Sequence, residues 1–171
     1  MLNVEGTEKY KSDKILSISD AKELIQKLKS QDKKVGLCHG GFDLLHPGHI
    51  KHFESAKKLC DVLFVSITSG KFVTLRKGAG RPIYPDKLRA YSISSIKFVD
   101  YVVISNFNTG VYIIKTLKPD YYIKGPDYVD STDSEINAER EAIDSVGGKI
   151  KCTNGPKLST TDMINYIKNE I

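Results

Sequence analysis

Ten residues in the first third of the chain, GGFDLLHPGH (40–49), combine groups that could bind phosphate. Gly40 and Gly41 allow the backbone to approach a ligand closely because neither carries a Cβ atom. His46 and His49 stand three residues apart at the expected start of a helix, so their rings should lie on the same side of its first turn. Imidazoles there can donate hydrogen bonds to phosphate oxygens, more strongly when charged, and the free N–H groups of a helix start attract the same anion. The spacing therefore predicts a phosphate site.

The same two histidines allow other interpretations. They could bind a metal ion, for which only Asp43 and His52 stand nearby as a third ligand, or they could simply belong to a helix start. The cysteines do not suggest a metal site, because there are three of them and none belongs to a CxxC pair. Cys38 and Cys60 lie in apolar segments and are expected to be buried thiols without a catalytic role.

The elements that must position the motif alternate between strand and helix. Apolar runs predict five short strands, at 34–38, 61–68, 99–105, 121–124 and 149–153. Helical spacing together with start and stop residues predicts helices at 20–29, 47–59, 85–97, 109–118, 134–146 and 159–170. This alternation predicts an α/β fold of the Rossmann-like type, with a five-stranded, mostly parallel sheet and helices on both faces.

The motif directly follows the first predicted strand, at the edge of the sheet where ligands of such folds bind. A long polar loop at 69–83 follows the second strand, and loops of this length are often functional. We expect a single domain over residues 15–171, preceded by a poorly ordered segment at 1–14.

Composition narrows the class of protein. The 171 residues are 40% hydrophobic and 27% charged, which is ordinary for a soluble globular protein. No apolar run approaches the roughly 18 residues needed to span a bilayer, and the N-terminus has no apolar secretion core, so we expect a cytoplasmic protein. The net charge of +5 suits an anionic partner. Because the lysines are spread along the chain, we expect small phosphorylated substrates rather than nucleic acid or a membrane.

GGFDLLHPGH resembles the HxGH signature of the cytidylyltransferase-like nucleotidyltransferase superfamily. Further blocks are similar, in order, to its sugar-phosphate branch: RKGAGRPI (76–83), VDYVV (99–103), KGPDY (124–128) and LSTTDMI (158–164). The resemblance runs from about residue 15 onward, and points to the nucleotidyltransferases for heptose 1-phosphate, which make ADP-heptose. It implies an enzyme that transfers a nucleoside monophosphate from a nucleoside triphosphate, with ATP favoured, to a sugar phosphate such as heptose 1-phosphate, and releases pyrophosphate.

The resemblance also implies a role for individual residues. His46 and His49 would hold the triphosphate, and Lys77 would neutralise the α-phosphate or the attacking sugar phosphate, so these three are the catalytic candidates. Arg89 would hold a substrate phosphate. The resemblance implies twelve nucleotide-binding residues: His46, His49, Gly40, Gly41, Phe42, Asp43, Lys124, Gly125, Asp127, Ser159, Thr160 and Thr161. Among these, Lys124 and the Gly125-Pro126 turn would lie against the base, and the Ser-Thr-Thr run would bind the β- and γ-phosphates.

Mg²⁺ is the expected cofactor, bound mainly through the phosphates. No side chain is implied as its ligand, although Asp43 is a candidate that could instead orient the turn. Members of the family are often dimers, and a homodimer with Tyr121 and Tyr122 at the interface is one option for this chain.

The chain departs from the family pattern at three places. His39 and Gly41 stand where the family commonly has Asn and Cys or Thr, and Pro126 replaces the second glycine of KGGDY. The stretch NGPKLSTT (154–161) also lacks the arginine typical of glycerol-3-phosphate cytidylyltransferases. A CTP-dependent cytidylyltransferase for glycerol phosphate or another polyol phosphate nevertheless stays open as an alternative. So does a non-catalytic nucleotide- or nucleic-acid-binding module, although the HPGH, Lys77 and STT set argues against it.

Overall fold

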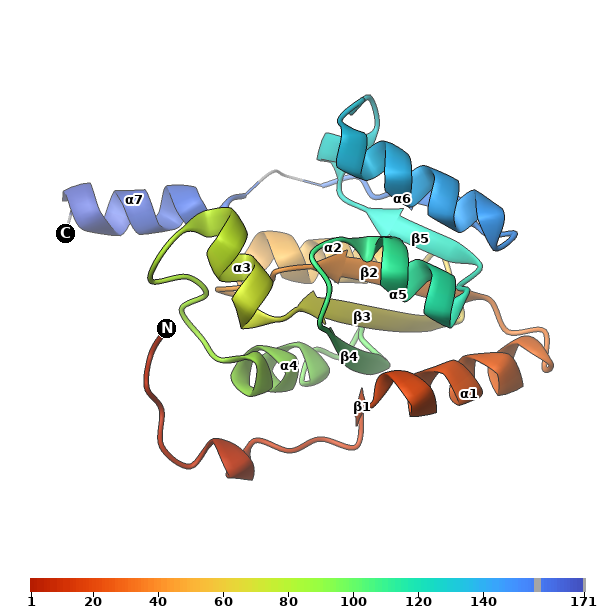
Figure 1. Ribbon diagram of the computed structural model, residues 1–171, viewed down its shortest axis with the longest axis horizontal. Coiled ribbons are helices and arrows are strands. Elements are labelled where there is room, and N and C mark those ends of the chain that lie inside the picture. The colour runs from red at the N-terminus through yellow and green to blue at the C-terminus, as the bar shows by residue number, and fades with distance from the viewer. Residues whose placement is uncertain (156–157, 171) are drawn as a thin grey trace.

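The computed structural model describes residues 1–155 and 158–170, and its centre is one parallel β-sheet (Figure 1). The strands lie in the order β1-β4-β3-β2-β5-β6, and every neighbouring pair is parallel. They are β1 (Ile15–Leu16), β2 (Val35–Gly40), β3 (Val62–Thr68), β4 (Tyr101–Ser105), β5 (Tyr121–Lys124) and β6 (Lys149–Cys152). The predicted Rossmann-like class is confirmed, with six strands instead of five. The additional strand is β1, whose two residues pair with Val102 and Val103 and are too few to give a pattern.

Helices cover both faces of the sheet. They are α1 (Ile18–Lys29), α2 (Pro47–Lys57), α3 (Gly70–Lys77), α4 (Asp86–Ser94), α5 (Gly110–Leu117), α6 (Ser134–Ser145) and α7 (Thr160–Glu170). Buried side chains of α1, α5 and α6 form one apolar cluster with the sheet, and those of α2 and α4 form another. In Figure 1 the first group lies in front of the sheet and α2 lies behind it.

The apolar run in β3 explains why a parallel sheet forms at this position. Phe64 belongs to the cluster with α1, α5 and α6, whereas Leu63, Val65 and Ile67 belong to the cluster with α2 and α4. All four side chains are fully buried. A strand that alternates between two covered faces must be apolar at nearly every position, as this one is.

Two of the differences between the predicted and the observed elements have a clear local cause. Helix α1 begins at Ile18 instead of Asp20, because the Ser17 side chain accepts a hydrogen bond from the Asp20 backbone N–H at 3.1 Å and caps the helix. The stretch 69–83, predicted to be a loop, contains α3. Of the residues of α3, only Gly70 and Val73 are buried, so the helix has no periodic apolar face that the sequence could reveal.

The N-terminal segment, predicted to be poorly ordered, lies along α4 and the turn before it. The backbone N–H of Leu2 donates to the carbonyl of Ile83 at 2.8 Å. Further along, the ring of Tyr10 meets that of Tyr91 edge to face, with centroids 5.3 Å apart. The 3-10 turn η1 (Thr7–Lys9) lies between these contacts.

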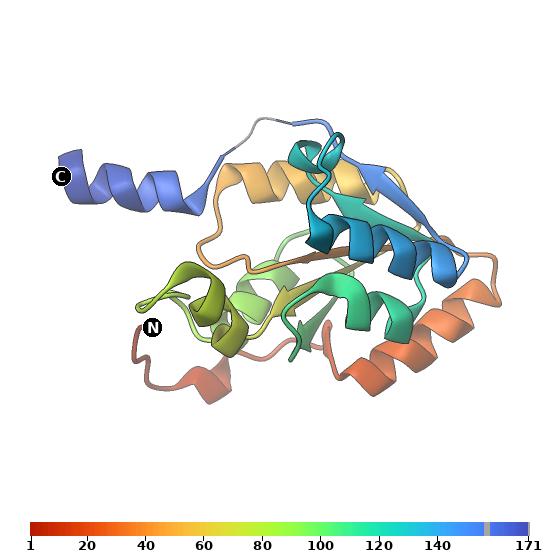
Figure 2. The same cartoon turned by 45° about the horizontal axis from the view of Figure 1, so that its top comes forward.

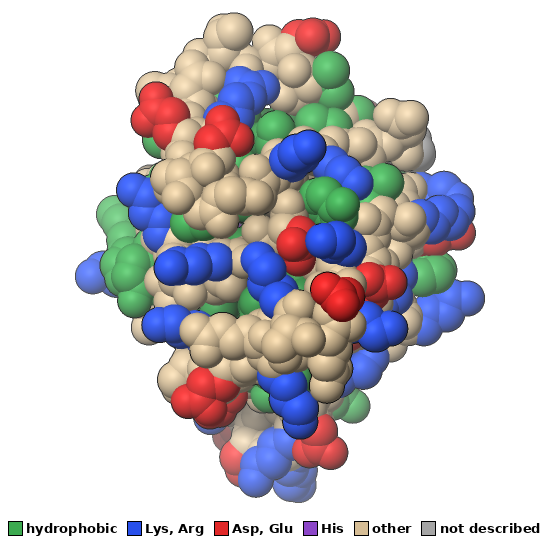
Figure 3. Space-filling model, turned by 90° about the vertical axis from the view of Figure 1, so that its right-hand side faces the viewer, with side chains coloured by type: hydrophobic (Ala, Val, Ile, Leu, Met, Phe, Trp, Pro, Cys, Tyr) green, Lys and Arg blue, Asp and Glu red, His purple; other side chains and the backbone are tan. Residues whose placement is uncertain are grey.

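Helix α7 extends away from the rest of the molecule in both ribbon views (Figure 2). Seen from the opposite side, where the strands begin, Lys and Arg side chains are interspersed with Asp and Glu side chains (Figure 3). None of the helices within residues 1–155 and 158–170 is both long and apolar enough to cross a membrane.

Candidate active site

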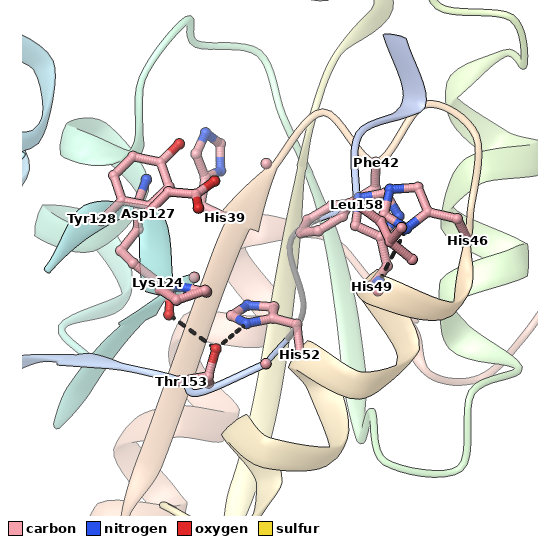
Figure 4. A pocket seen from close by; sticks show the side chains of 15 residues that line it. His39, Phe42, His46, His49, His52, Lys124, Asp127, Tyr128, Thr153 and Leu158 are labelled. Atoms are coloured by element: carbon pink, nitrogen blue, oxygen red, sulfur yellow. Dashed lines mark hydrogen bonds between the residues drawn. The ribbon is translucent and has the colours of Figure 1, made fainter. Parts of the chain in front are cut away.

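A cavity of about 220 Å³ lies where β2, β5 and β6 end and α2 begins (Figure 4). All four histidines of the chain line it, together with the turn after β5 and the segment after β6. We call it the histidine pocket; its lining residues are His39, Gly40, Phe42, His46, Gly48, His49, His52, Lys124, Gly125, Pro126, Asp127, Tyr128, Thr153, Gly155 and Leu158. The sheet therefore brings the HPGH motif and the KGPDY block together, although they are more than 70 residues apart in sequence.

The rings of His46 and His49 stack with centroids 3.7 Å apart, which confirms that the two face the same side of the first turn. His46 is the N-cap of α2, and its Nδ1 atom accepts a hydrogen bond from the His49 backbone N–H at 3.4 Å. Because Nδ1 accepts, the proton of a neutral His46 ring lies on Nε2, which can donate to a ligand. Gly48 makes room for this arrangement, since a Cβ atom there would lie 3.0 Å from Nδ1 of His46.

The surroundings of the two rings favour their neutral forms. Burial, and then the charge on a protonated His46, lowers the pKa of His49 to about 3. Burial, followed by the nearby Lys77 cation, also lowers the pKa of His46. The sequence indicated that charged rings would donate more strongly, but the pair is neutral at pH 7. Phe42 packs its ring edge to face against His49, with centroids 5.3 Å apart, and helps to hold it.

His39, one of the departures from the family pattern, forms part of the pocket wall. Its Nδ1 atom lies 3.1 Å from the Ser66 hydroxyl, and its Nε2 atom lies 3.3 Å from the Thr68 hydroxyl. Burial lowers its pKa to about 3, so the ring is neutral. Both nitrogens are therefore engaged by hydroxyls of the adjacent strand β3, and the ring fills space between the strand ends.

Asp43 orients the turn of the motif. Its carboxylate is 2% exposed and accepts hydrogen bonds from Nε of Arg81 and from the backbone N–H of Ile83. These contacts join the motif to the segment that follows α3. Of the two roles considered for Asp43, the structure supports orientation of the turn.

Arg89 occupies a different place from the one predicted. Its side chain is 1% exposed, and its guanidinium group donates to the carbonyl oxygens of Gly41, Thr68 and Tyr84 and pairs with Asp86 at 2.7 Å. The prediction that it holds a substrate phosphate does not fit this arrangement, because the group is buried and used by the protein. It supports the backbone beneath the motif instead.

The KGPDY block forms the opposite wall of the pocket. Lys124 is 7% exposed and pairs with the buried Glu139 at 3.0 Å, and its ammonium group lies 4.0 Å from the centroid of the Tyr128 ring. Pro126, the second departure, begins the short 3-10 helix η2 (Pro126–Tyr128), where proline's missing N–H costs nothing. Gly125 and Asp127, two of the residues expected to bind nucleotide, also line the pocket.

Lys77 lies beside a second hollow of about 300 Å³ that adjoins the histidine pocket and shares His39, Gly40, Lys124 and Tyr128 with it. We call it the lysine hollow; its other lining residues are Gly41, Arg76, Lys77, Asp133, Glu135, Ile136 and Glu139. Partial desolvation at the edge of the hollow, and then the charge of Arg81, lowers the pKa of Lys77, whose side chain stays exposed. The hollow thus contains both cations and carboxylates.

The Ser159-Thr160-Thr161 run opens α7. The Ser159 hydroxyl accepts from the Thr161 backbone N–H at 3.1 Å, and the Thr160 hydroxyl donates to the carbonyl of Leu44 at 3.3 Å. The last contact ties the start of α7 to the motif. Residues 156 and 157 of the NGPKLSTT stretch lie outside the described residues.

A family model described as cytidylyltransferase-like matches residues 37–166, which contain the motif, the pocket walls and the start of α7. The chain belongs to the cytidylyltransferase-like family. This is the family that the sequence predicted from the GGFDLLHPGH motif.

Curated relatives support the membership. The bifunctional protein HldE of Campylobacter jejuni subsp. doylei is 38% identical over 155 residues, which are 90% of this chain and 32% of the relative. That of Nitratiruptor sp. is 44% identical over 130 residues, 74% of this chain and 28% of the relative. The cytidylyltransferase-like chain thus spans about a third of the length of these relatives.

Two solved structures resemble it as well. A lipopolysaccharide core biosynthesis protein from Thermoplasma volcanium aligns with a TM-score of 0.58 and 27% identity, over 74% of this chain and 99% of that one. A pantoate-beta-alanine ligase from Francisella tularensis aligns with a TM-score of 0.60 over 90% of this chain and 76% of that one. Its identity is 18%, so it supports the fold alone.

His52 and Thr153 are among the pocket residues of this cytidylyltransferase-like chain that were not predicted as nucleotide-binding. His52 follows His49 by three residues, and the same helical spacing that linked His46 to His49 could have indicated it. No pattern in the sequence indicated that Thr153 lines the pocket, because only the pairing of β5 with β6 places it beside Lys124.

The side chains of the described ranges, 1–155 and 158–170, contain no group of three or more His, Cys, Asp and Glu that could hold a metal ion. The four histidines therefore line one pocket without converging on a point. The thiols of Cys38 and Cys60 are free, and burial raises the pKa of Cys60 to about 11, so neither is activated. Tyr122 is fully buried in the core, so it cannot form part of the dimer interface suggested for it.

Proposed function

We propose that the chain transfers the AMP moiety of ATP to a sugar phosphate of the heptose 1-phosphate type and releases pyrophosphate. A phosphate oxygen of the acceptor attacks the α-phosphorus of ATP, and the bond from that phosphorus to the bridging oxygen of pyrophosphate breaks. The observation that carries the proposal is the stacked His46–His49 pair in a pocket that adjoins the hollow beside Lys77. Triphosphate and acceptor phosphate would meet where the two hollows join.

The residue types suit this reaction. Both reactants are anions, so the protein must mainly bring them together and neutralise charge. Nε2–H of His46 can donate to the triphosphate, and the positive end of the α2 dipole favours its negative charge. Lys77 can neutralise the acceptor phosphate, and the carboxylates of the lysine hollow can accept hydrogen bonds from sugar hydroxyls. A sugar acceptor also agrees with the likeness to the Thermoplasma protein, which serves lipopolysaccharide core biosynthesis.

Mg²⁺ is the cofactor that we expect for this reaction. The carboxylate of Asp43 is already engaged by Arg81 and Ile83, so the donor set fits an ion that arrives bound to the triphosphate. When bound, Mg²⁺ would neutralise phosphate charge. We place the reaction in the cytoplasm, with the two small substrates as partners rather than nucleic acid. A homodimer stays a prediction, which light scattering of the purified chain can test.

A pyrophosphate-release screen tests the assignment. ATP, CTP, GTP and UTP are each combined with heptose 1-phosphate, glycerol 3-phosphate or no acceptor, with Mg²⁺ present. We expect release with ATP and heptose 1-phosphate together. Release with CTP and glycerol 3-phosphate instead would show that these are the substrates, in place of ATP and heptose 1-phosphate. If no pair gave release, the enzymatic proposal would be overturned. Lys77→Ala should lower the rate by about 10², whereas Lys71→Ala, at an exposed position of the same helix, should not.

A further inference from the structure

His52 joins the two walls of the histidine pocket. It lies on α2, and its Nδ1 atom is 2.8 Å from the hydroxyl oxygen of Thr153. That hydroxyl is buried and lies 3.3 Å from the carbonyl oxygen of Lys124, which also accepts from the Thr153 backbone N–H at 2.9 Å. Figure 4 shows this chain of contacts running from the His52 ring through Thr153 to Lys124.

The positions of the protons in this chain follow from the groups involved. The carbonyl oxygen of Lys124 can only accept, so we infer that the hydroxyl of Thr153 donates its one hydrogen to it. In that arrangement Nδ1–H of the His52 ring is the donor in the contact with Thr153. Burial, and next the Lys124 charge, lowers the pKa of His52 to about 4, so the ring is neutral at pH 7. A neutral ring with its proton on Nδ1 has a lone pair on Nε2.

The free lone pair borders the region where the base would lie. His52 follows His46 and His49 along α2, and it lines the histidine pocket together with Gly125 and Pro126. Among the described residues, no group forms a hydrogen bond with Nε2 of His52. The pocket therefore presents an oriented acceptor beyond its phosphate end.

We propose that Nε2 of His52 accepts a hydrogen bond from the exocyclic amino group of the nucleobase and thereby selects adenine or cytosine. This inference rests on the proposed nucleotidyl transfer. Adenine and cytosine carry an amino group at the corresponding position, whereas guanine and uracil carry a carbonyl oxygen there. An acceptor that faces another acceptor leaves both unpaired, which should weaken binding by about 10- to 100-fold. Thr153 acts as a positioning residue, because it fixes the tautomer of the ring.

The sharpest test compares ATP with inosine triphosphate, which differs by an oxygen in place of the amino group. Calorimetric titration of each nucleotide needs no acceptor and so separates base selection from catalysis. We expect the wild type to bind ATP about 10- to 100-fold more tightly. His52→Leu should bring the ratio close to 1, Thr153→Val should lower it by releasing the tautomer, and Lys51→Ala, on the exposed side of α2, should leave it unchanged.

The outcomes distinguish this inference from the proposal on which it rests. If the wild type binds neither nucleotide, both fail. If it binds ATP and inosine triphosphate equally, or if His52→Leu keeps the full preference, only the role of His52 fails. Nitrogen NMR of the wild-type ring gives an independent measurement that needs no variant: a proton on Nδ1 supports the inference, and a proton on Nε2 overturns it.

Discussion

At the scale of single residues, the site depends on neutral histidines with defined hydrogen-bonding roles. The backbone N–H of His49 occupies Nδ1 of His46 and leaves Nε2–H to donate, so no charge is needed to orient it. A preorganised neutral donor stabilises developing phosphate charge without being reoriented during the reaction. The spacing in the sequence indicated the pairing of the rings. Their neutrality could not be predicted, because it comes from burial and from the Lys77 charge.

His49→Ala should lower turnover by about 10² or more, as expected for the loss of one donor together with the stacking that holds His46. The measurement is the rate of pyrophosphate release at saturating substrates. Lys51→Ala is the matched control on the same helix, and it should retain wild-type turnover. Near-normal turnover in His49→Ala would mean that the ring serves only to pack against Phe42.

At the scale of elements, the motif is fixed by contacts with segments distant in sequence. Asp43 joins it to Arg81 and Ile83, and the Thr160 hydroxyl joins it to the start of α7. The turn therefore depends on the path of the chain after α3 as much as on its own glycines.

Asp43→Asn should weaken the fold by about 1–3 kcal/mol, because the amide NH₂ would face one of the two donors now bound by the carboxylate. Urea unfolding measures the loss, and Asp144→Asn, at an exposed position of α6, should show little change. If Asp43 held Mg²⁺ instead, the variant would unfold like the wild type and need more Mg²⁺ for half-maximal activity.

Most elements were predictable because their patterns are local. The apolar run of β3 and the Gly147 stop after α6, where φ is +77°, each signal an element by themselves. Helix α3 gave no such signal, since Leu75 is 72% exposed and Val73 alone anchors it to the core. The orientation of Arg89 could not be predicted for a related reason. Whether an arginine on α4 turns inward depends on backbone carbonyl groups of the motif that lie beneath it, and their positions cannot be inferred from the sequence.

At the scale of the whole molecule, the sheet gathers every histidine of the chain at one edge, where His46 is buried and the other three are half-buried. The pKa values of His39 and His49 fall to about 3 and that of His52 to about 4, chiefly through burial, and the pKa of His46 falls as well. The unfolded chain exposes the same rings, whose pKa is then near 6.5. Below that pH the unfolded state binds protons that the folded state excludes.

Stability should therefore be nearly flat between about pH 7 and 8 and should fall as the pH drops below 6.5, by up to about 1.4 kcal/mol per pH unit for each of these histidines. Between pH 7 and 5.5, where carboxylates of ordinary pKa stay largely ionised, we expect a total loss of roughly 4 kcal/mol. Urea midpoints across this range give the slope. His52→Leu should make the slope shallower, because one titrating ring is gone, whereas Lys51→Ala should not. A stability that stays constant or rises toward pH 5.5 would contradict the burial of neutral histidines at this edge of the sheet.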